Sequence, residues 1–154
     1  MKQWLAMTAL ASMLSASIAT AQSPQSAIAP MMDELMAAAN AHDTDRYLAP
    51  FLHDSSLVFI VNTLVINGYP TLHDLQWKAW NSPKTDAIYS RRAPDRYEVL
   101  TPTLVLSTSL LGSSRTAPTG ETKKTEMVVT MLWQLRSDGW RIIETHESTA
   151  PVTN

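Results

Sequence analysis

The 154-residue sequence contains no cysteine, so disulfides cannot stabilise it and a thiol cannot be its nucleophile. Its stability must come from a packed core, a bound ligand or self-association. It also lacks the GxSxG, P-loop and GxGxxG motifs. The usual sequence signatures of hydrolytic and nucleotide-dependent chemistry are therefore missing, and we expect no cofactor.

Basic clusters are equally scarce. The 12 lysines and arginines are outnumbered by 14 acidic residues, and no basic run is longer than Arg91-Arg92 or Lys123-Lys124. Nucleic-acid binding depends on a basic surface that neutralises phosphates. We therefore expect no nucleic-acid partner.

A long apolar run occurs only near the start of the chain. Lys2 precedes apolar residues 4–18, which end in the small-residue site Ala19-Thr20-Ala21. This pattern predicts a secretory signal peptide over residues 1–21. An uncleaved membrane anchor is the alternative, but hydroxyl residues dilute the run and it is shorter than the roughly twenty apolar residues that a spanning helix needs. We expect a secreted or periplasmic protein with no membrane contact after cleavage.

The remainder has the length of one domain, and we place a flexible leader at residues 22–28, the domain at 29–151 and a tail at 152–154. Apolar residues at helical spacing predict a first helix that starts near Pro30, and Thr44 is a suitable N-cap for a second, shorter one. A third helix is expected from about Pro70 to Asn81. Residues 57–61 and 64–66 predict a hairpin before it.

Strand patterns dominate the second half of the chain. Residues 97–111, 126–135 and 140–148 are rich in valine, leucine, isoleucine and threonine and are separated by turn residues. They predict three long strands in an antiparallel meander. Helices followed by a meander indicate an α+β domain, with the helices covering one face of a curved sheet.

The last strand raises the main functional question, because it begins apolar and becomes polar. Alternate residues share one face, which groups Trp140, Ile142, Glu144, His146 and Ser148. If that face lines a cavity, His146 is the candidate for proton transfer, Glu144 orients its ring and Ser148 donates a hydrogen bond to the ligand. The alternative is that the strand leaves the core here, so that its end is solvated and His146 is structural.

Aromatic residues supply further candidates for a cavity wall. Trp77 and Trp80 lie three residues apart on the third predicted helix, and Tyr47 and Trp133 are possible lining residues. Trp77 and Trp80 could equally pack as ordinary core, and the sequence does not fix the face on which Trp133 lies. Asp54 is a second acid that could orient His146. Each histidine precedes an acidic residue, but no pair has the HxxxH or HxH spacing of a metal site, so we expect no metal.

Taken together, the segments "NAHDTDRYLAPFLHDSSLVFI", "INGYPTLHDLQWKAW" and "LWQLRSDGWRIIETHESTAP" resemble the SnoaL-like branch of the nuclear transport factor 2-like superfamily over residues 29–151. The last segment is also similar to the association domain of calcium/calmodulin-dependent protein kinase. The similarity lies in the spacing of nine residues: Thr130, Trp133, Asp138, Gly139, Trp140, His146, Ser148, Ala150 and Pro151.

This resemblance implies a conical, cystatin-like fold with a ligand-sized cavity and assembly through the outer face of the sheet. Two departures limit what it implies about chemistry. Met131 stands where the association domain has an arginine that helps to bind acidic ligands. Phe59 and Ile60 lie near the place of the catalytic aspartate of ketosteroid isomerases.

Three hypotheses follow from the sequence. The first is an exported domain that binds a small, largely apolar molecule. The second is a general acid/base enzyme of the isomerase, dehydratase or cyclase type. The third is a homo-oligomeric assembly module, which is suggested by apolar residues on both faces of residues 104–111 and 128–132. A homodimer is compatible with either of the first two.

Overall fold

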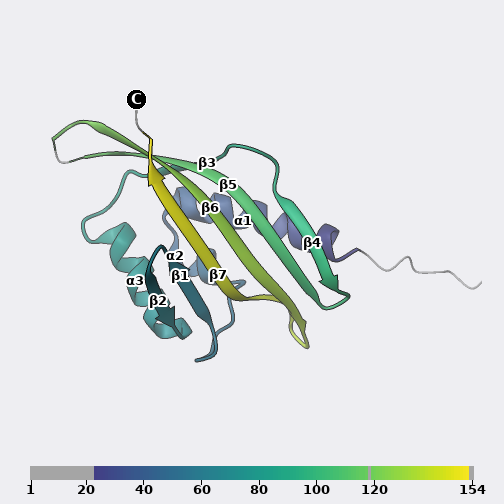
Figure 1. The fold of residues 1–154 in the computed structure, drawn as a ribbon. Helices are drawn as coiled ribbons and strands as arrows, with labels where there is room; N and C mark the ends of the chain where they lie inside the picture. Colours follow the sequence, from purple (N-terminus) through teal and green to yellow (C-terminus); the bar gives the residue numbers. More distant parts are fainter. Residues whose placement is uncertain (1–22, 118, 153–154) are drawn as a thin grey trace, which may run out of the picture.

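A computed structural model describes residues 23–117 and 119–152, and the predicted signal peptide lies outside them. This part contains three helices and seven strands (Figure 1). In chain order they are α1 (Pro24–Ala41), α2 (Thr44–Leu48), β1 (Val58–Val61), β2 (Leu64–Asn67), α3 (Tyr69–Asn81), β3 (Ile88–Arg91), β4 (Arg96–Thr101), β5 (Leu104–Thr116), β6 (Thr122–Arg136) and β7 (Gly139–Pro151). Of these helices, none is long and apolar enough to cross a membrane.

The strands form one mixed sheet in the order β2-β1-β7-β6-β5-β3, and β4 also pairs with β5. The predicted meander is present in β5, β6 and β7, which pair antiparallel over most of their length. β1 is parallel to β7, so the hairpin of β1 and β2 extends the same sheet. The predicted strand 97–111 is divided between β4 and β5 by a turn at residues 102–103.

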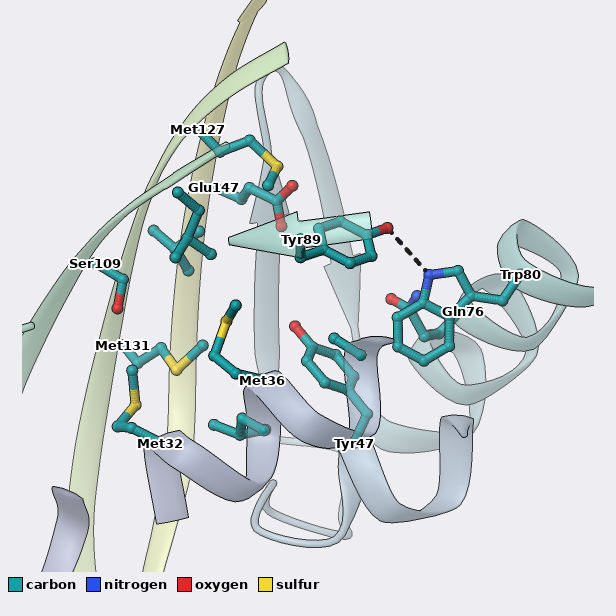
Figure 2. A pocket seen from close by; sticks show the side chains of 14 residues that line it. Met32, Met36, Tyr47, Gln76, Trp80, Tyr89, Ser109, Met127, Met131 and Glu147 are labelled. Atoms are coloured by element: carbon teal, nitrogen blue, oxygen red, sulfur yellow. Dashed lines mark hydrogen bonds between the residues drawn. The ribbon is translucent and has the colours of Figure 1, made fainter. Parts of the chain in front are cut away.

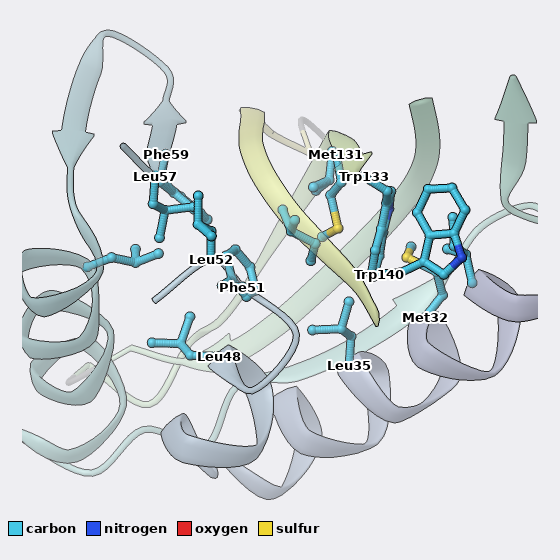
Figure 3. Packing of buried hydrophobic residues seen from close by; sticks show 14 of the residues in the cluster. Met32, Leu35, Leu48, Phe51, Leu52, Leu57, Phe59, Met131, Trp133 and Trp140 are labelled. Atoms are coloured by element: carbon cyan, nitrogen blue, oxygen red, sulfur yellow. The ribbon is translucent and has the colours of Figure 1, made fainter. Parts of the chain in front are cut away.

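The helices lie on one face of the curved sheet, which we call the inner face (Figure 1). Two of them, α1 and α2, precede the sheet in the sequence, whereas α3 follows the β1–β2 hairpin. The core between helices and sheet holds Leu35 of α1, Phe51, and Trp133 of β6, each less than 4% exposed (Figure 3). Burial of such large side chains is the main favourable contribution to folding.

The first helix begins earlier than the sequence suggested. Ser23 accepts a hydrogen bond from the backbone amide of Ser26, and Pro24 occupies the first turn, where its missing amide costs nothing. Residues 24–28 are therefore helical rather than a loose leader, and Ile28 is fully buried. For α2 the N-cap is Asp43, whose carboxylate accepts from the amide of Arg46, and not Thr44.

A register shift in β7 decides which residues face the helices. Ile142 pairs with Trp133, but Glu144 pairs with Leu132, so Ile143 is an extra residue on β7. Such a β-bulge resets the alternation of side chains along its strand. Ile142 is buried on the inner face before the bulge, and Thr145 is buried there after it. From Glu144 onward the face predicted from simple alternation is therefore wrong.

Candidate functional site

A cavity of about 110 Å³ lies between the inner face of the sheet and the helices, and we call it the chamber. Its walls come from α1, α3, β3 and the three long strands, and from Tyr47 of α2 (Figure 2). The lining residues are Met32, Leu35, Met36, Ala39, Tyr47, Gln76, Trp80, Tyr89, Ser109, Leu111, Met127, Val129, Met131 and Glu147. Most of this wall is apolar, as is typical of small-molecule sites.

Glu147 is the acidic residue of the chamber. It is the second inward-facing residue after the bulge, and in Figure 2 its carboxyl group points into the space between β6 and Tyr89. Burial raises the pKa of Glu147 above its ordinary value, because an apolar surrounding disfavours the charged form. Within the described residues its carboxyl group has neither a hydrogen bond nor an ion pair. The chamber thus holds an acid that is free to bind a ligand.

Two tyrosines accompany this acid. Burial raises the pKa of Tyr47 far above its ordinary range, and the nearby charge of Glu147 raises it further. The pKa of Tyr89 is also raised, chiefly by burial. Both phenols therefore stay protonated at neutral pH and can donate hydrogen bonds.

The orientation of Tyr89 is fixed from two sides. Its hydroxyl oxygen accepts a hydrogen bond of 3.2 Å from the indole nitrogen of Trp80 (Figure 2). Its backbone amide donates to the side chain of Asn40 at 2.7 Å, and the amide of Asn40 donates back to its carbonyl oxygen at 3.0 Å. The C-terminal end of α1 and the helix α3 thereby hold β3 at the chamber. The phenolic proton of Tyr89 remains available to a ligand.

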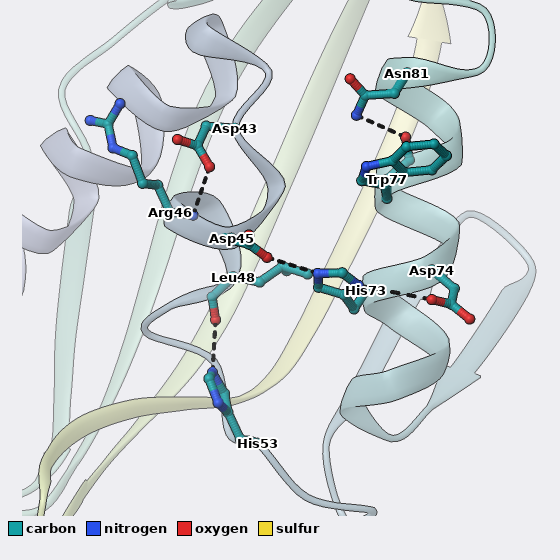
Figure 4. Close-up of polar contacts among 9 residues, drawn as sticks. All are labelled: Asp43, Asp45, Arg46, Leu48, His53, His73, Asp74, Trp77 and Asn81. Carbon is teal, nitrogen blue, oxygen red and sulfur yellow. Dashed lines mark hydrogen bonds and ion pairs between the residues drawn. The ribbon is translucent and has the colours of Figure 1, made fainter.

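Contacts between α2 and α3 position Tyr47 against Trp80. The ring nitrogen of His73 on α3 lies 2.9 Å from the carboxylate of Asp45 on α2 (Figure 4). The rings of Tyr47 and Trp80 meet edge to face with centroids 5.2 Å apart. Offset and edge-to-face contacts of this kind are the favourable geometry for aromatic pairs. The two helices therefore present one aromatic wall to the chamber.

Of the aromatic residues predicted to line a cavity, two do so. Tyr47 and Trp80 are in the chamber wall. Trp77 is 50% exposed and does not line the chamber. Trp133 is fully buried in the core (Figure 3). Its indole nitrogen donates to the hydroxyl of Ser107 at 2.9 Å.

The polar residues predicted for the site do not reach the chamber. Glu144, His146 and Ser148 are exposed on the outer face of the sheet, because the bulge at Ile143 reverses the alternation. Asp54 lies in the loop before β1, where its carboxylate accepts hydrogen bonds from the hydroxyl and amide of Ser56. Both bonds lower the pKa of Asp54, and the bond from the hydroxyl of Ser56 has the larger effect. The structure does not bring these four residues together.

Sequence reasoning missed Glu147, Gln76 and Tyr89 as chamber residues. The signal for Glu147 was the pair Ile142-Ile143, since two consecutive apolar residues in an amphipathic strand are consistent with a bulge. Gln76 is one helical turn from Trp80 and so shares its face. Tyr89 carried no comparable signal, because the strand β3 is only four residues long.

The described residues contain no group of three or more histidine, aspartate or glutamate side chains placed to hold a metal ion. The three histidines of the helical half instead make contacts close to helix ends. His42 lies 2.7 Å from the carbonyl oxygen of Ala87, and His53 lies 3.3 Å from that of Leu48 (Figure 4). The polar groups in the chamber wall include the carboxyl group of Glu147, the phenols of Tyr47 and Tyr89, the amide of Gln76 and the hydroxyl of Ser109, which donates to Asp95.

No family model matches the sequence, and no curated protein matches it. Solved structures do match its fold. A nuclear transport factor 2-like superfamily protein from Salmonella enterica serovar Typhimurium LT2 has a TM-score of 0.71 at 15% identity, covering 82% of this chain and 91% of its own. A hexachlorocyclohexane dehydrochlorinase, LinA-type3, from Novosphingobium barchaimii LL02 has a TM-score of 0.70 at 13% identity, with 84% and 90% covered.

A third similar structure is described as a putative calcium/calmodulin-dependent protein kinase II association domain, from Xanthomonas campestris. Its TM-score is 0.68 at 14% identity, and the match covers 87% of this chain and 93% of that one. These similarities confirm the predicted nuclear transport factor 2-like, cystatin-like fold. Proteins of this fold include both enzymes and assembly domains, so function must be inferred from the site.

Proposed function

We propose that this chain, which has the nuclear transport factor 2-like fold, binds a small and largely apolar molecule in the chamber. The observation that carries this proposal is the carboxyl group of Glu147, which is partly buried in the chamber wall and has no protein hydrogen bond or ion pair in the described part of the chain. A polar group that is withdrawn from water without a partner costs free energy. A ligand with one hydrogen-bonding group recovers that cost, and its apolar body suits the methionine and leucine walls.

A matched pair of substitutions tests whether the chamber is the binding site. Leu111 lines the chamber, and its neighbour Leu110 is 38% exposed on the outer face. Leu111→Trp fills the chamber, whereas Leu110→Trp makes the same change outside it. We expect calorimetric titration with cyclohexanol, a neutral probe of suitable size, to give at least tenfold weaker binding for Leu111→Trp and unchanged binding for Leu110→Trp. Equal binding by both variants, with unchanged melting temperatures, would place the site elsewhere.

A second candidate function is general acid/base catalysis in the same chamber. Glu147 supports it, since a carboxyl group with a raised pKa exchanges protons nearer to neutral pH. In an isomerisation, Glu147 would remove a proton from one carbon and return it to another. Tyr47 and Tyr89 would donate hydrogen bonds to the carbonyl oxygen of the substrate, which becomes negatively charged between the two proton transfers. Glu147 thereby takes the role that the sequence had suggested for His146.

Catalysis, unlike simple binding, requires the protein to exchange hydrogen on the bound substrate. Incubation of the protein with a cyclic β,γ-unsaturated ketone in deuterium oxide would exchange hydrogen next to the carbonyl group. We expect Glu147→Gln to abolish the exchange and to retain binding of the ketone. Exchange at the rate of the buffer alone, in protein that binds the ketone, would exclude catalysis on this substrate class and leave the binding function standing.

We also propose that the chain is exported and forms a homodimer through the outer face of the sheet. The N-terminal sequence pattern supports export, and the half-exposed Leu110 and Val128 on the outer face support self-association. The mass of the protein recovered from the periplasm tests cleavage after Ala21. Light scattering tests the dimer, and Val128→Lys is expected to convert it to a monomer, whereas a monomeric wild type contradicts it.

A further inference from the structure

A second cavity, of about 400 Å³, adjoins the chamber and is here called the outer groove. It lies between α3, the β1–β2 hairpin and the far ends of β5, β6 and β7. Five residues line both cavities, namely Gln76, Trp80, Tyr89, Met127 and Glu147. The chamber and the outer groove are therefore neighbouring parts of one site, with Glu147 where they meet.

The outer groove is mostly apolar and has a charged residue at each end. Its apolar wall includes Phe59, Ile66 and Leu72, and its charged lining residues are Glu147 and Arg115. Glu147 is level with Ser109 across the sheet, since both pair with Val129. Arg115 is six residues farther along β5, which is roughly 20 Å at the rise of an extended strand. A ligand that contacts both must be elongated.

The far end of the outer groove is positively charged. An adjoining cavity of about 600 Å³ shares Arg115 and adds Lys84, Lys123 and Asp86. The carboxylate of Asp86 is already bonded to the backbone amide of Thr116, at 3.0 and 3.2 Å. Arg115 and the two lysines have no ion pair among the described residues. The far end of the outer groove is therefore lined by three basic side chains and by one acid, Asp86, whose carboxylate is already hydrogen-bonded.

The side chain of Arg115 is exposed to solvent, but its positive charge also acts inside the outer groove. Burial raises the pKa of Tyr89, and the positive charge of Arg115 makes a small opposing contribution, so Arg115 is within electrostatic reach of the junction with the chamber. A guanidinium without a protein partner binds carboxylates through charge-assisted hydrogen bonds. The opposite end of the site disfavours an anionic group. The carboxyl group of Glu147 would repel a second negative charge, and the buried surroundings that raise the pKa of Glu147 also disfavour a charged ligand group.

Building on the proposed binding function, we propose that the natural ligand is an elongated apolar molecule with one anionic end group, and that Arg115 binds this group at the mouth of the outer groove. The apolar body lies along the groove, and the uncharged end reaches Glu147 and the chamber. The shared chemistry is that of a carboxylate on a hydrocarbon chain or ring system. Arg115 therefore determines specificity for the charge of the ligand.

Three probes that differ only in the head group separate charge from apolar contact. Decanoate is anionic, 1-decanol is neutral and decyltrimethylammonium is cationic. We expect the wild type to bind decanoate most tightly and the cation most weakly. Arg115→Gln should weaken decanoate binding about five- to tenfold and leave decanol binding unchanged, because a partly exposed charge-assisted contact contributes a modest part of the affinity. Arg115→Lys should retain part of the preference.

Lys124→Gln is the matched control, since Lys124 lies on the opposite face of β6 and its loss changes the net charge equally. It should leave all three affinities unchanged. Equal loss of decanoate binding in both variants would indicate a general effect of net charge and would overturn the role of Arg115. Stronger decanoate binding in Glu147→Gln, with no effect of Arg115→Gln, would mean that the anion enters the chamber. Failure of decanol to bind would contradict the proposed function itself.

Discussion

The two ends of the inner sheet face are built from the same strands, yet one is closed and the other is hollow. At the closed end, Trp133 and Trp140 fill the space between the sheet and α1 (Figure 3). The hydroxyl of Ser107 accepts a hydrogen bond from the indole nitrogen of Trp133. At the hollow end, the corresponding positions on β6 hold Val129 and Met127, and β7 supplies Glu147. The closed end thus carries two tryptophans, whereas the hollow end carries smaller or more flexible side chains that leave a cavity.

The largest effect is expected when residues are exchanged between the inner and outer faces. Deletion of Thr145 would move Glu147 to the outer face and bring His146 into the core. We expect a loss of at least about 3 kcal/mol in the free energy of unfolding, measured with urea, because a polar ring would replace a fully buried threonine. Deletion of Ile143 is the control, as it removes the extra residue and keeps Glu147 on the inner face. A smaller loss for the Thr145 deletion than for the Ile143 deletion would contradict the assigned faces.

The closed end should be sensitive to loss of volume. Trp133→Ala removes a fully buried indole, and we expect it to lower the free energy of unfolding by about 3–5 kcal/mol. Trp77→Ala, at a half-exposed tryptophan, should change it by less than about 1 kcal/mol. Chemical denaturation of both variants at one pH gives the comparison. Similar losses in the two variants would mean that the closed end is not close-packed.

The hollow end should be sensitive to pH through Glu147. Its pKa is raised in the folded protein, so the stability that it contributes is present below its unfolded pKa and is lost as the pH rises through the folded pKa. Glu147→Gln removes this dependence. The melting temperature of the variant minus that of the wild type should therefore increase from pH 4 to pH 8. A constant difference over this range would show that the carboxyl group is not desolvated.

The smallest effect is expected on the outer face. His146→Ala changes an exposed residue, so the free energy of unfolding should change by less than about 0.5 kcal/mol. Binding of cyclohexanol in the chamber should be unaffected. Calorimetric titration of wild type and variant measures this directly. A loss of cyclohexanol binding in this variant would show that His146 contributes to the binding site.

Much of the fold followed from periodicity and turn chemistry. Apolar patterns placed the three helices, the hairpin and the meander. They missed the early start of α1 at Pro24 and the division of the predicted strand 97–111 into β4 and β5. The sequence did not reveal the parallel pairing of β1 with β7, since this contact joins residues far apart in the chain. It also did not reveal the short β3, which pairs with β5 and whose Tyr89 backbone is bonded to the side chain of Asn40.

The site was predicted less well than the fold, and one residue explains most of the difference. Alternation along β7 was applied without a bulge, and the extra Ile143 moved Glu147 rather than His146 to the inner face. A strand pattern fixes which residues share a face only as long as the register is continuous. Tyr47 and Trp80 do lie in the chamber wall, whereas Trp77, on the same helix as Trp80, does not.

Four thioethers surround the chamber, from Met32 and Met36 on α1 and from Met127 and Met131 on β6 (Figure 2). Methionine is unbranched and polarizable, so this lining can change shape at little cost. Such a wall accommodates molecules of differing outline. Oxidation of these sulfur atoms to sulfoxides would make the lining polar and would weaken its contacts with an apolar ligand. The methionines that let the chamber accept different ligands therefore also make ligand binding sensitive to oxidants.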